Sequence, residues 1–122
     1  MSKNLAFRPG GQLSLPVPAG TESGDPVKVG GLIGVATTPR GGGVGNLPTH
    51  ASIDISGLNV YEFDVDGSIS GVGTPIYITS GADLTVTSTS NTLFGHTVAA
   101  ADGKYATKSS GVGKALVKPV TV

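Results

Sequence analysis

Hydrophobic and polar residues alternate along several short stretches of the chain, and a period of two is typical of half-buried β-strands. The clearest example is the stretch 49–55. One of its faces takes Ala51, Ile53 and Ile55, and the other takes His50, Ser52 and Asp54. A similar alternation runs through 58–65, where we expect the core face to consist of Tyr61, Phe63 and Val65.

Further short strands are predicted between turns that are rich in glycine, proline and aspartate. Pro16 and Pro18 place the first strand at a sheet edge or leave the segment merely extended. Gly30 with Gly31 indicates a hairpin turn. We expect a break at Gly95, and a single helical turn as an alternative at 99–101. The predicted strands are 13–17, 25–29, 32–37, 49–55, 58–65, 74–79, 84–87, 93–100 and 114–122.

Two segments have no strand pattern. Residues 1–12 carry scattered apolar and basic side chains and end in glycines, which predicts a flexible arm, with a frayed terminus of no function as the alternative. Residues 38–48 contain so many glycines and prolines that we expect a long, mobile surface loop. The expected organisation is an arm over 1–12 and a single β domain over 13–122.

The composition supports short strands joined by turns. The 122 residues include 20 glycines and 8 prolines, which break helices. We therefore expect an all-β fold, a compact small barrel or sandwich of about eight short strands with little or no helix. No apolar run is long enough for a membrane helix, and no secretion signal is found at the N-terminus.

Charge and cysteine content narrow the classes of function. Only 13% of the residues are charged and the formal net charge is zero, which argues against a nucleic-acid-binding protein with a basic surface. Weak charge gives little protection against association, so we expect partners to cover much of the surface. The absence of cysteine excludes disulfides and thiolate metal sites.

No pattern of catalytic residues is found. We expect both His50 and His96 to be structural, because no further ligands stand at metal-binding spacing. The run 67–71 has glycines at the separation of a nucleophile elbow, but Ile69 occupies the position of the nucleophile. A triad assembled from distant parts of the chain stays a formal alternative, since triads are recognised by geometry.

Two motifs for ion or cofactor binding are incomplete. The stretch 62–67 has acidic residues and a glycine where a calcium loop begins, but Gly73 replaces the required glutamate. The run 111–114 is similar to the end of a phosphate-binding loop, yet Lys108 and Ala115 stand at positions that need Gly and Ser or Thr. We predict no catalytic, cofactor or metal site, with a weak surface cation site left open.

The residues expected to contact a partner lie in the arm and in the glycine-rich loop. An apolar ring on an arm is costly to leave in water, so Phe7 is expected to dock onto a partner. The predicted partner-binding residues are Lys3, Leu5, Phe7, Arg8, Arg40, Gly42 and Val44.

Several short runs together resemble a family of small proteins from the head genes of tailed bacteriophages, the capsid cement or head-decoration proteins, long treated as a domain of unknown function. The resemblance extends over roughly residues 10–100. The runs that carry it are LSLPVPAGT at 13–21, SGDPV at 23–27, VG at 29–30, GVA at 34–36, GVGTPIYI at 71–78 and LFG at 93–95.

The resemblance implies a protein on the exterior of the virion capsid, made in the host bacterial cytoplasm. Such proteins often form homotrimers at threefold positions, where they bind the major capsid protein and stabilise the shell. The resemblance implies no enzymatic activity, no cofactor, and no contact with nucleic acid or membrane. Two alternatives stay open: another virion tail, fibre or glycan-binding β module, and a small enzyme with His50 or His96 beside a Ser or Asp in a pocket.

Overall fold

The computed structural model describes residues 12–42, 46–57, 59–99 and 107–120. Within these ranges it is all-β, with nine strands and no helix, which confirms the predicted fold class. No described helix is therefore long and apolar enough to cross a membrane. The strands are β1 (Gln12–Pro16), β2 (Pro26–Val29), β3 (Leu32–Ala36), β4 (His50–Asp54), β5 (Tyr61–Asp66), β6 (Pro75–Ile78), β7 (Leu84–Thr85), β8 (Thr92–Val98) and β9 (Val112–Pro119).

The first four strands form an open antiparallel sheet in the order β1-β4-β3-β2. β2 and β3 form the predicted hairpin, in which Val29 pairs with Leu32 across the two-residue turn. Gly30 in this turn has φ of 58°, a conformation that favours glycine. β1 and β2 lie at the two edges of the sheet, which confirms the edge position predicted from the proline at the end of β1.

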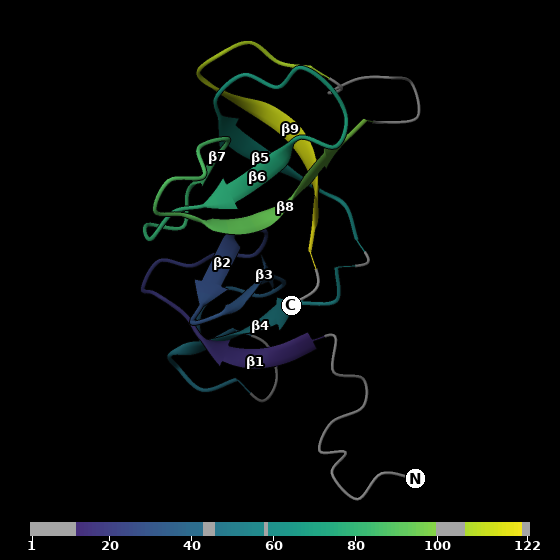
Figure 1. The fold of residues 1–122 in the computed structure, drawn as a ribbon. Helices are drawn as coiled ribbons and strands as arrows, with labels where there is room; N and C mark the ends of the chain where they lie inside the picture. Colours follow the sequence, from purple (N-terminus) through teal and green to yellow (C-terminus); the bar gives the residue numbers. More distant parts are fainter. Residues whose placement is uncertain (1–11, 43–45, 58, 100–106, 121–122) are drawn as a thin grey trace, which may run out of the picture.

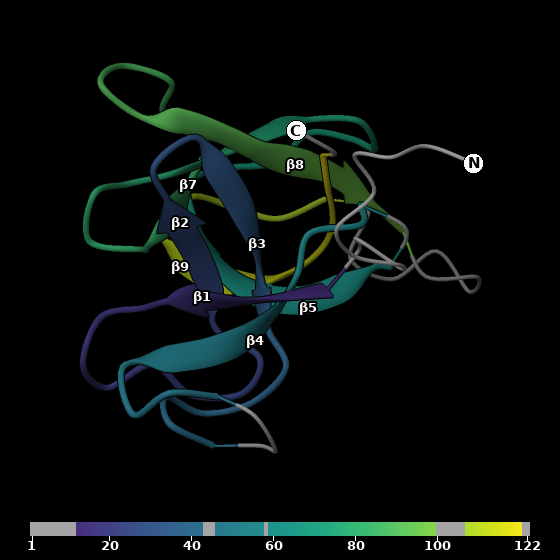
Figure 2. The ribbon, with the colours of Figure 1, turned by 90° about the horizontal axis from the view of Figure 1, so that it is seen from below.

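The last five strands close into a barrel in the order β5-β7-β6-β8-β9. Pairing of Phe63 with Ala115 and its neighbours joins β5 to β9 and closes the ring. The short strand β7 runs parallel to β5 and antiparallel to β6. The barrel sits above the open sheet in Figure 1, and Figure 2 shows the sheet lying across the barrel's lower end.

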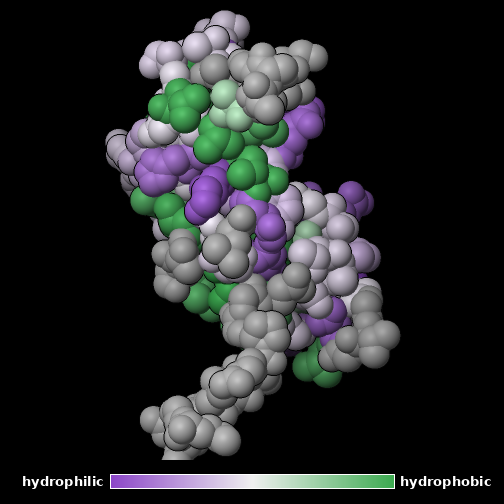
Figure 3. Space-filling view, turned by 90° about the vertical axis from the view of Figure 1, so that its right-hand side faces the viewer, coloured by the Kyte–Doolittle hydropathy of each residue, from purple (hydrophilic) through white to green (hydrophobic). Residues whose placement is uncertain are grey.

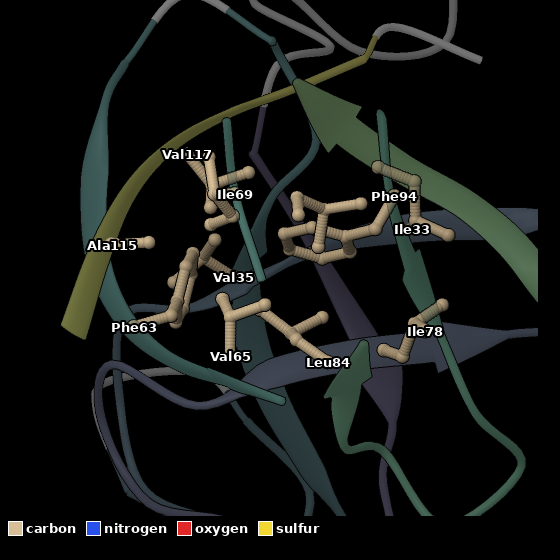
Figure 4. Close-up of a cluster of buried hydrophobic side chains, with 11 residues drawn as sticks. Ile33, Val35, Phe63, Val65, Ile69, Ile78, Leu84, Phe94, Ala115 and Val117 are labelled. Atoms are coloured by element: carbon tan, nitrogen blue, oxygen red, sulfur yellow. The ribbon is translucent and has the colours of Figure 1, made fainter. Parts of the chain in front are cut away.

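The main hydrophobic core fills the barrel and continues into the sheet. Phe63 and Phe94 meet edge to face, with ring centroids 5.5 Å apart and planes at 82°, a favourable geometry for two rings. Ile33 and Val35 of β3 belong to the same cluster, and Figure 4 shows them among the barrel side chains. The side chains of β3 thus close the lower end of the barrel.

A smaller cluster covers the opposite face of the sheet. It consists of Val17, Val27, Ala36, Ala51 and Ile53, all of them buried. Successive side chains of one strand point to opposite faces of the sheet, and directly opposed residues of neighbouring strands point to the same face. The two clusters therefore lie on opposite faces. Both faces of the sheet are therefore covered by other parts of the chain.

The core face predicted for 58–65 is confirmed. Phe63 and Val65 are buried and Tyr61 is half-buried, while Ile76 and Ile78 are fully buried. The strand boundaries differ by a few residues: β5 begins at position 61, β7 has two residues, and β9 begins at position 112 and ends at position 119. The alternative helical turn at 99–101 lies mostly outside the described residues.

The predicted break at Gly95 is wrong, because β8 runs through this position. A Cβ at Gly95 would lie 2.5 Å from the carbonyl oxygen of Lys118, so glycine permits the close approach of β9. The register slips beside it, where Ile76 pairs with Gly95 and Tyr77 with Leu93. This β-bulge lets Phe94 and Thr97 both face inward although an odd number of positions separates them.

Candidate functional site

A cleft of about 970 Å³ lies between the open sheet and the barrel. One wall consists of the loop after β1 and of β2 itself, including Pro26 and Lys28. The other wall consists of the first half of β5, the turn at 79–83 and the side chain of Lys114. Its volume is at the large end of the range for binding pockets, about 300–1,000 Å³, which suits an extended ligand.

The cleft has an excess of acidic side chains. Asp25, Glu62, Asp64 and Asp83 line it, against two basic residues, Lys28 and Lys114. Lys114 Nζ lies 3.1 Å from Asp64 Oδ1, with both side chains more than half exposed. An exposed ion pair of this kind contributes about 0–1 kcal/mol to stability, so its main effect is on the local charge.

Two tight turns hold the acidic side chains on the rim of the cleft. The backbone N–H of Glu22 donates to Asp25 Oδ2 at 2.9 Å. The N–H of Asp83 donates to Thr79 Oγ1 at 3.1 Å, and Ala82 between them has φ of 64°. The first contact fixes the carboxylate of Asp25 and the second fixes the backbone of Asp83. A carboxylate that is already fixed loses less entropy when a cationic ligand binds.

The glycine-rich loop contributes two of the predicted partner-binding residues to the described structure. Arg40 is exposed, and its Nε donates to the carbonyl oxygen of Val17 at 3.1 Å. Gly42 accepts a hydrogen bond at its carbonyl from Asn46 Nδ2 at 2.6 Å. Asn46 Nδ2 also donates to Ser52 Oγ at 3.1 Å, so these contacts fasten the loop to β4.

The other predicted partner-binding residues fall outside the part of the chain that the structure describes. They are Lys3, Leu5, Phe7, Arg8 and Val44. Neither Arg40 nor Gly42 lines the cleft. The two described residues of the prediction therefore lie on a different surface from the cleft.

The histidines lie apart from the cleft and from each other. His50 is on β4, where its Nδ1 lies 3.0 Å from Thr49 Oγ1. His96 is on β8, exposed, opposite Lys118 of β9. Within the described ranges, no group of three or more His, Asp or Glu side chains is arranged to hold a metal ion.

A polar cluster that the sequence did not predict joins the sheet to the barrel. Asp54 at the end of β4 is 4% exposed, and it accepts hydrogen bonds from the hydroxyl of Tyr61 at 2.5 Å and from Asn59 Nδ2 at 2.7 Å. The N–H and the hydroxyl of Ser56 donate to its other oxygen at 3.0 and 2.7 Å. Tyr61 begins β5, so this cluster connects the two halves of the fold.

The electrostatics of this cluster follow from its hydrogen bonds. Burial alone would raise the pKa of Asp54, but the hydrogen bonds from Tyr61, Ser56 and Asn59 outweigh burial and lower the pKa to about 2. Burial first, and then the hydrogen bond to Asp54 and its negative charge, raise the pKa of Tyr61. Asp54 thus stays ionised and Tyr61 stays a donor, an arrangement for structure and not for proton transfer.

Exposed apolar side chains do not form one continuous patch on the face seen in Figure 3. Green hydrophobic areas over the barrel are separated there by purple hydrophilic ones. The large exposed apolar residues in the described ranges are Leu47, Val60, Val72 and Val112. Scattered residues of this kind are normal on a protein surface, so the cleft is the more specific feature.

The comparisons with known proteins agree with the sequence resemblance. A family model described as phage cement protein matches residues 7–112. Comparison with curated proteins and with solved structures gives no match. The matched family is one of structural proteins of the phage capsid and not a class of enzymes. Because the match covers the whole sheet and four of the five barrel strands, the chain belongs to the phage cement protein family.

Proposed function

We propose that this chain binds the exterior of a phage capsid as a trimer at threefold positions and stabilises the shell, with the major capsid protein as its partner. It is made in the host bacterial cytoplasm and joins the virion there. This function needs no catalysis, cofactor, nucleic-acid contact or membrane. The observation that carries the proposal is the family match over residues 7–112.

The distribution of unpaired strand edges supports a binding function. A closed barrel has no edges to offer, whereas the open sheet leaves the outer edges of β1 and β2 without a strand partner among the described residues. Unpaired edges are templates for strand addition, a common way to bind an extended segment. The sheet is therefore the half of the fold that we assign to partner binding.

The arm over residues 1–12 continues directly into β1 at one of these edges. At about 3.3 Å per residue, a fully extended arm of this length reaches roughly 40 Å, enough to contact a neighbouring subunit. Three arms on one trimer would bind with avidity, because the first contact raises the effective concentration of the others. We expect the domain from residue 13 onward to fold without the arm.

The glycine-rich loop is a second candidate for contact with the capsid, after the arm, because it carries Arg40. Its exposed side chain is held by the hydrogen bond from Nε to Val17, so the guanidinium presents its remaining donors from a fixed position. A planar guanidinium suits bidentate pairing with a carboxylate of the capsid protein. We therefore place Arg40 and Gly42 in the surface that touches the shell, together with Val44.

Co-sedimentation with purified capsids, followed by cryo-electron microscopy, tests this function. We expect the full chain to pellet with expanded capsids and to add density on the shell exterior at threefold positions. A variant that begins at residue 13 should keep its far-ultraviolet circular dichroism and bind capsids more weakly. Particles that show no added density at saturating protein would contradict the proposed function, and unchanged binding of the truncated protein would contradict the role of the arm.

A further inference from the structure

We propose that the cleft between the sheet and the barrel receives residues 1–11 of a neighbouring copy of this chain, so that three copies join head to tail in a closed ring. This inference deepens the proposed function, because it rests on the trimer named there and identifies the contact that holds it together. The occupant is a segment of the same chain, and the cleft is its receptor.

Charge complementarity is the first argument. Four carboxylates and two ammonium groups line the cleft, and one of those ammonium groups pairs with Asp64. Residues 1–11 contain Lys3 and Arg8 and no acidic residue. Opposite charges at close range favour binding and exclude like-charged segments. The acidic excess of the cleft thus fits the basic arm.

Apolar complementarity is the second argument. The cleft is lined not only by charged groups but also by the accessible apolar residues Pro18, Ala19, Pro26 and Ala82. The arm contains Leu5, Phe7 and Pro9 between its basic residues. A lining with both acidic and apolar groups matches a segment whose side chains are both basic and apolar.

The free edge of β2 is the third argument. The carbonyl of Asp25, directly before β2, accepts a hydrogen bond from the N–H of Ala36 at 2.9 Å. Asp25 is therefore one of the residues whose backbone groups point toward β3. Bonded and non-bonded pairs alternate along an antiparallel ladder, so the backbone groups of Pro26 and Lys28 point away from β3. The N–H and C=O of Lys28 and the C=O of Pro26 therefore face the cleft edge, where an extended segment pairs with them.

The position of the arm favours a neighbouring copy over the same chain. The arm leaves from β1, at the opposite edge of the four-stranded sheet from β2. To reach its own cleft it would have to cross one face of the sheet. Ile33 and Val35 pack against the barrel on one face, and Ala36 and Ile53 are buried on the other. At about 3.3 Å per residue, eleven residues span at most roughly 36 Å, which suits a direct path to an adjacent molecule.

Closure into a ring is one of the two outcomes of such a contact, the other being an open filament, and the proposed trimer requires the ring. An arm and a cleft are different surfaces, so the interface is heterologous, and such interfaces close into rings when the rotation permits. In a ring of three, every arm is bound and every cleft is filled. An arm held in a neighbouring cleft does not reach the shell, so here the arm strengthens capsid binding by holding the trimer together, and the three domains of one trimer supply the avidity.

Mass measurement of the free protein, by light scattering after size exclusion, tests the contact without capsids. We expect a trimer for the full chain and a monomer for residues 12–122. Reversing the cleft charge with Glu62→Lys and Asp83→Lys should also give a monomer. Ser70→Lys, Ser88→Lys, Ser109→Lys and Ser110→Lys together make the same change in net charge at exposed positions that do not line the cleft, and this control should stay a trimer.

A charge swap tests the pairing of arm and cleft directly. Lys3→Glu with Arg8→Glu should give a monomer, and combining these changes with Glu62→Lys and Asp83→Lys in one chain should restore the trimer. Circular dichroism should first show that the arm variant, the cleft variant and the combined variant are all folded. If the combined variant is folded but stays a monomer, the proposal is overturned. Equal loss of the trimer in the control with four lysines outside the cleft would overturn it as well.

Hydrogen exchange at the amide of Lys28 identifies the occupant. We expect slow exchange in the full chain, fast exchange in residues 12–122, and slow exchange again when a synthetic peptide of residues 1–11 is added. Slow exchange in a monomeric full chain would mean that the chain's own arm fills the cleft. Slow exchange only on capsids would mean that the capsid protein fills it, and either result overturns the proposal.

These outcomes are separate from those of the proposed function. If the arm does not enter the cleft, the swap fails while the full chain still pellets with capsids. If the protein does not bind capsids, particles stay bare although the free protein forms its trimer and the swap restores it.

Discussion

Removal of the Tyr61 hydroxyl by the Tyr61→Phe change tests whether the buried polar cluster joins the two halves of the fold. The hydroxyl donates to Asp54 Oδ2 at 2.5 Å, and Asp54 is 4% exposed. A hydrogen bond to a charged group contributes about 1.5–3 kcal/mol, and a buried acceptor that loses its partner also loses solvation. We expect the change to lower the free energy of unfolding by about 2 kcal/mol at neutral pH.

The pH dependence gives this prediction a second, independent measurement. Folding lowers the pKa of Asp54 from its usual 3.8 to about 2, so the folded state binds this proton less readily than the unfolded state. The resulting stability, about 2 kcal/mol at 1.36 kcal/mol per pKa unit, is present above pH 3.8 and is lost as the pH falls through 2. Tyr61→Phe raises the pKa of Asp54 toward its usual value, so the difference between the two proteins should shrink in that window.

Urea unfolding followed by circular dichroism at neutral pH and at several values between pH 4 and 2 measures both effects. Tyr77→Phe is the matched control, because Tyr77 is also half-buried but lies on β6, away from Asp54. We expect this control to cost well under 1 kcal/mol and to show no such pH dependence. A Tyr61→Phe effect that is equally large at pH 7 and at pH 2 would refute the coupling between the hydroxyl and the carboxylate.

Three further predictions concern the barrel, and equilibrium unfolding checks the first two. Gly95→Ala should destabilise the fold by more than 2 kcal/mol, because the new Cβ would meet the backbone at Lys118. The control Gly71→Ala should change stability little, because there is open space around Gly71. Equal losses of stability in the two variants would contradict the close packing at Gly95. Phe94→Ala should cost about 3–5 kcal/mol, since Phe94 is fully buried. Val35→Ala should speed hydrogen exchange in β4 and β8 together, because Val35 belongs to the barrel core; faster exchange in β4 alone would indicate that the two halves unfold separately.

The local pattern of the sequence predicted which side chains of each strand are buried. Alternation identified Phe63 and Val65 as core residues, because the side-chain period of a strand is a property of its own backbone. Proline likewise predicted the edge position of β1, since it cannot donate to a neighbouring strand. These features need no knowledge of the partner strand.

The features that depend on distant parts of the chain were not predicted. β5 closes the barrel with β9 and pairs in parallel with β7, and neither contact leaves a local signal. Gly95 was interpreted as a break because a strand interior rarely contains glycine, whereas the reason for this residue lies on β9. The cleft escaped prediction for the same reason, since its lining comes from segments that are far apart in the sequence.

Asp54 shows how a local signal can be misinterpreted. Alternation places it on the polar face of β4 together with Ser52, and such a face is expected to meet water. In the structure this face of the sheet lies toward the barrel, where Asp54 is buried and satisfied by its hydrogen bonds. A possible signal was the spacing of Asp54 and Ser56, which is typical of a turn in which the aspartate accepts the N–H two positions later.

The two halves of the fold have different parts in the function that we propose. The barrel leaves no strand edge unpaired, and its interior supplies most of the buried apolar area, so changes inside it should lower stability without changing the choice of partner. The sheet has both unpaired edges, and one of them faces the acidic wall that the barrel contributes through Glu62 and Asp83. Changes at that rim should alter assembly and leave stability nearly unchanged, because both side chains are exposed. A protein that must hold neighbours together under load gains from this separation, since its binding surface can vary while its core stays intact.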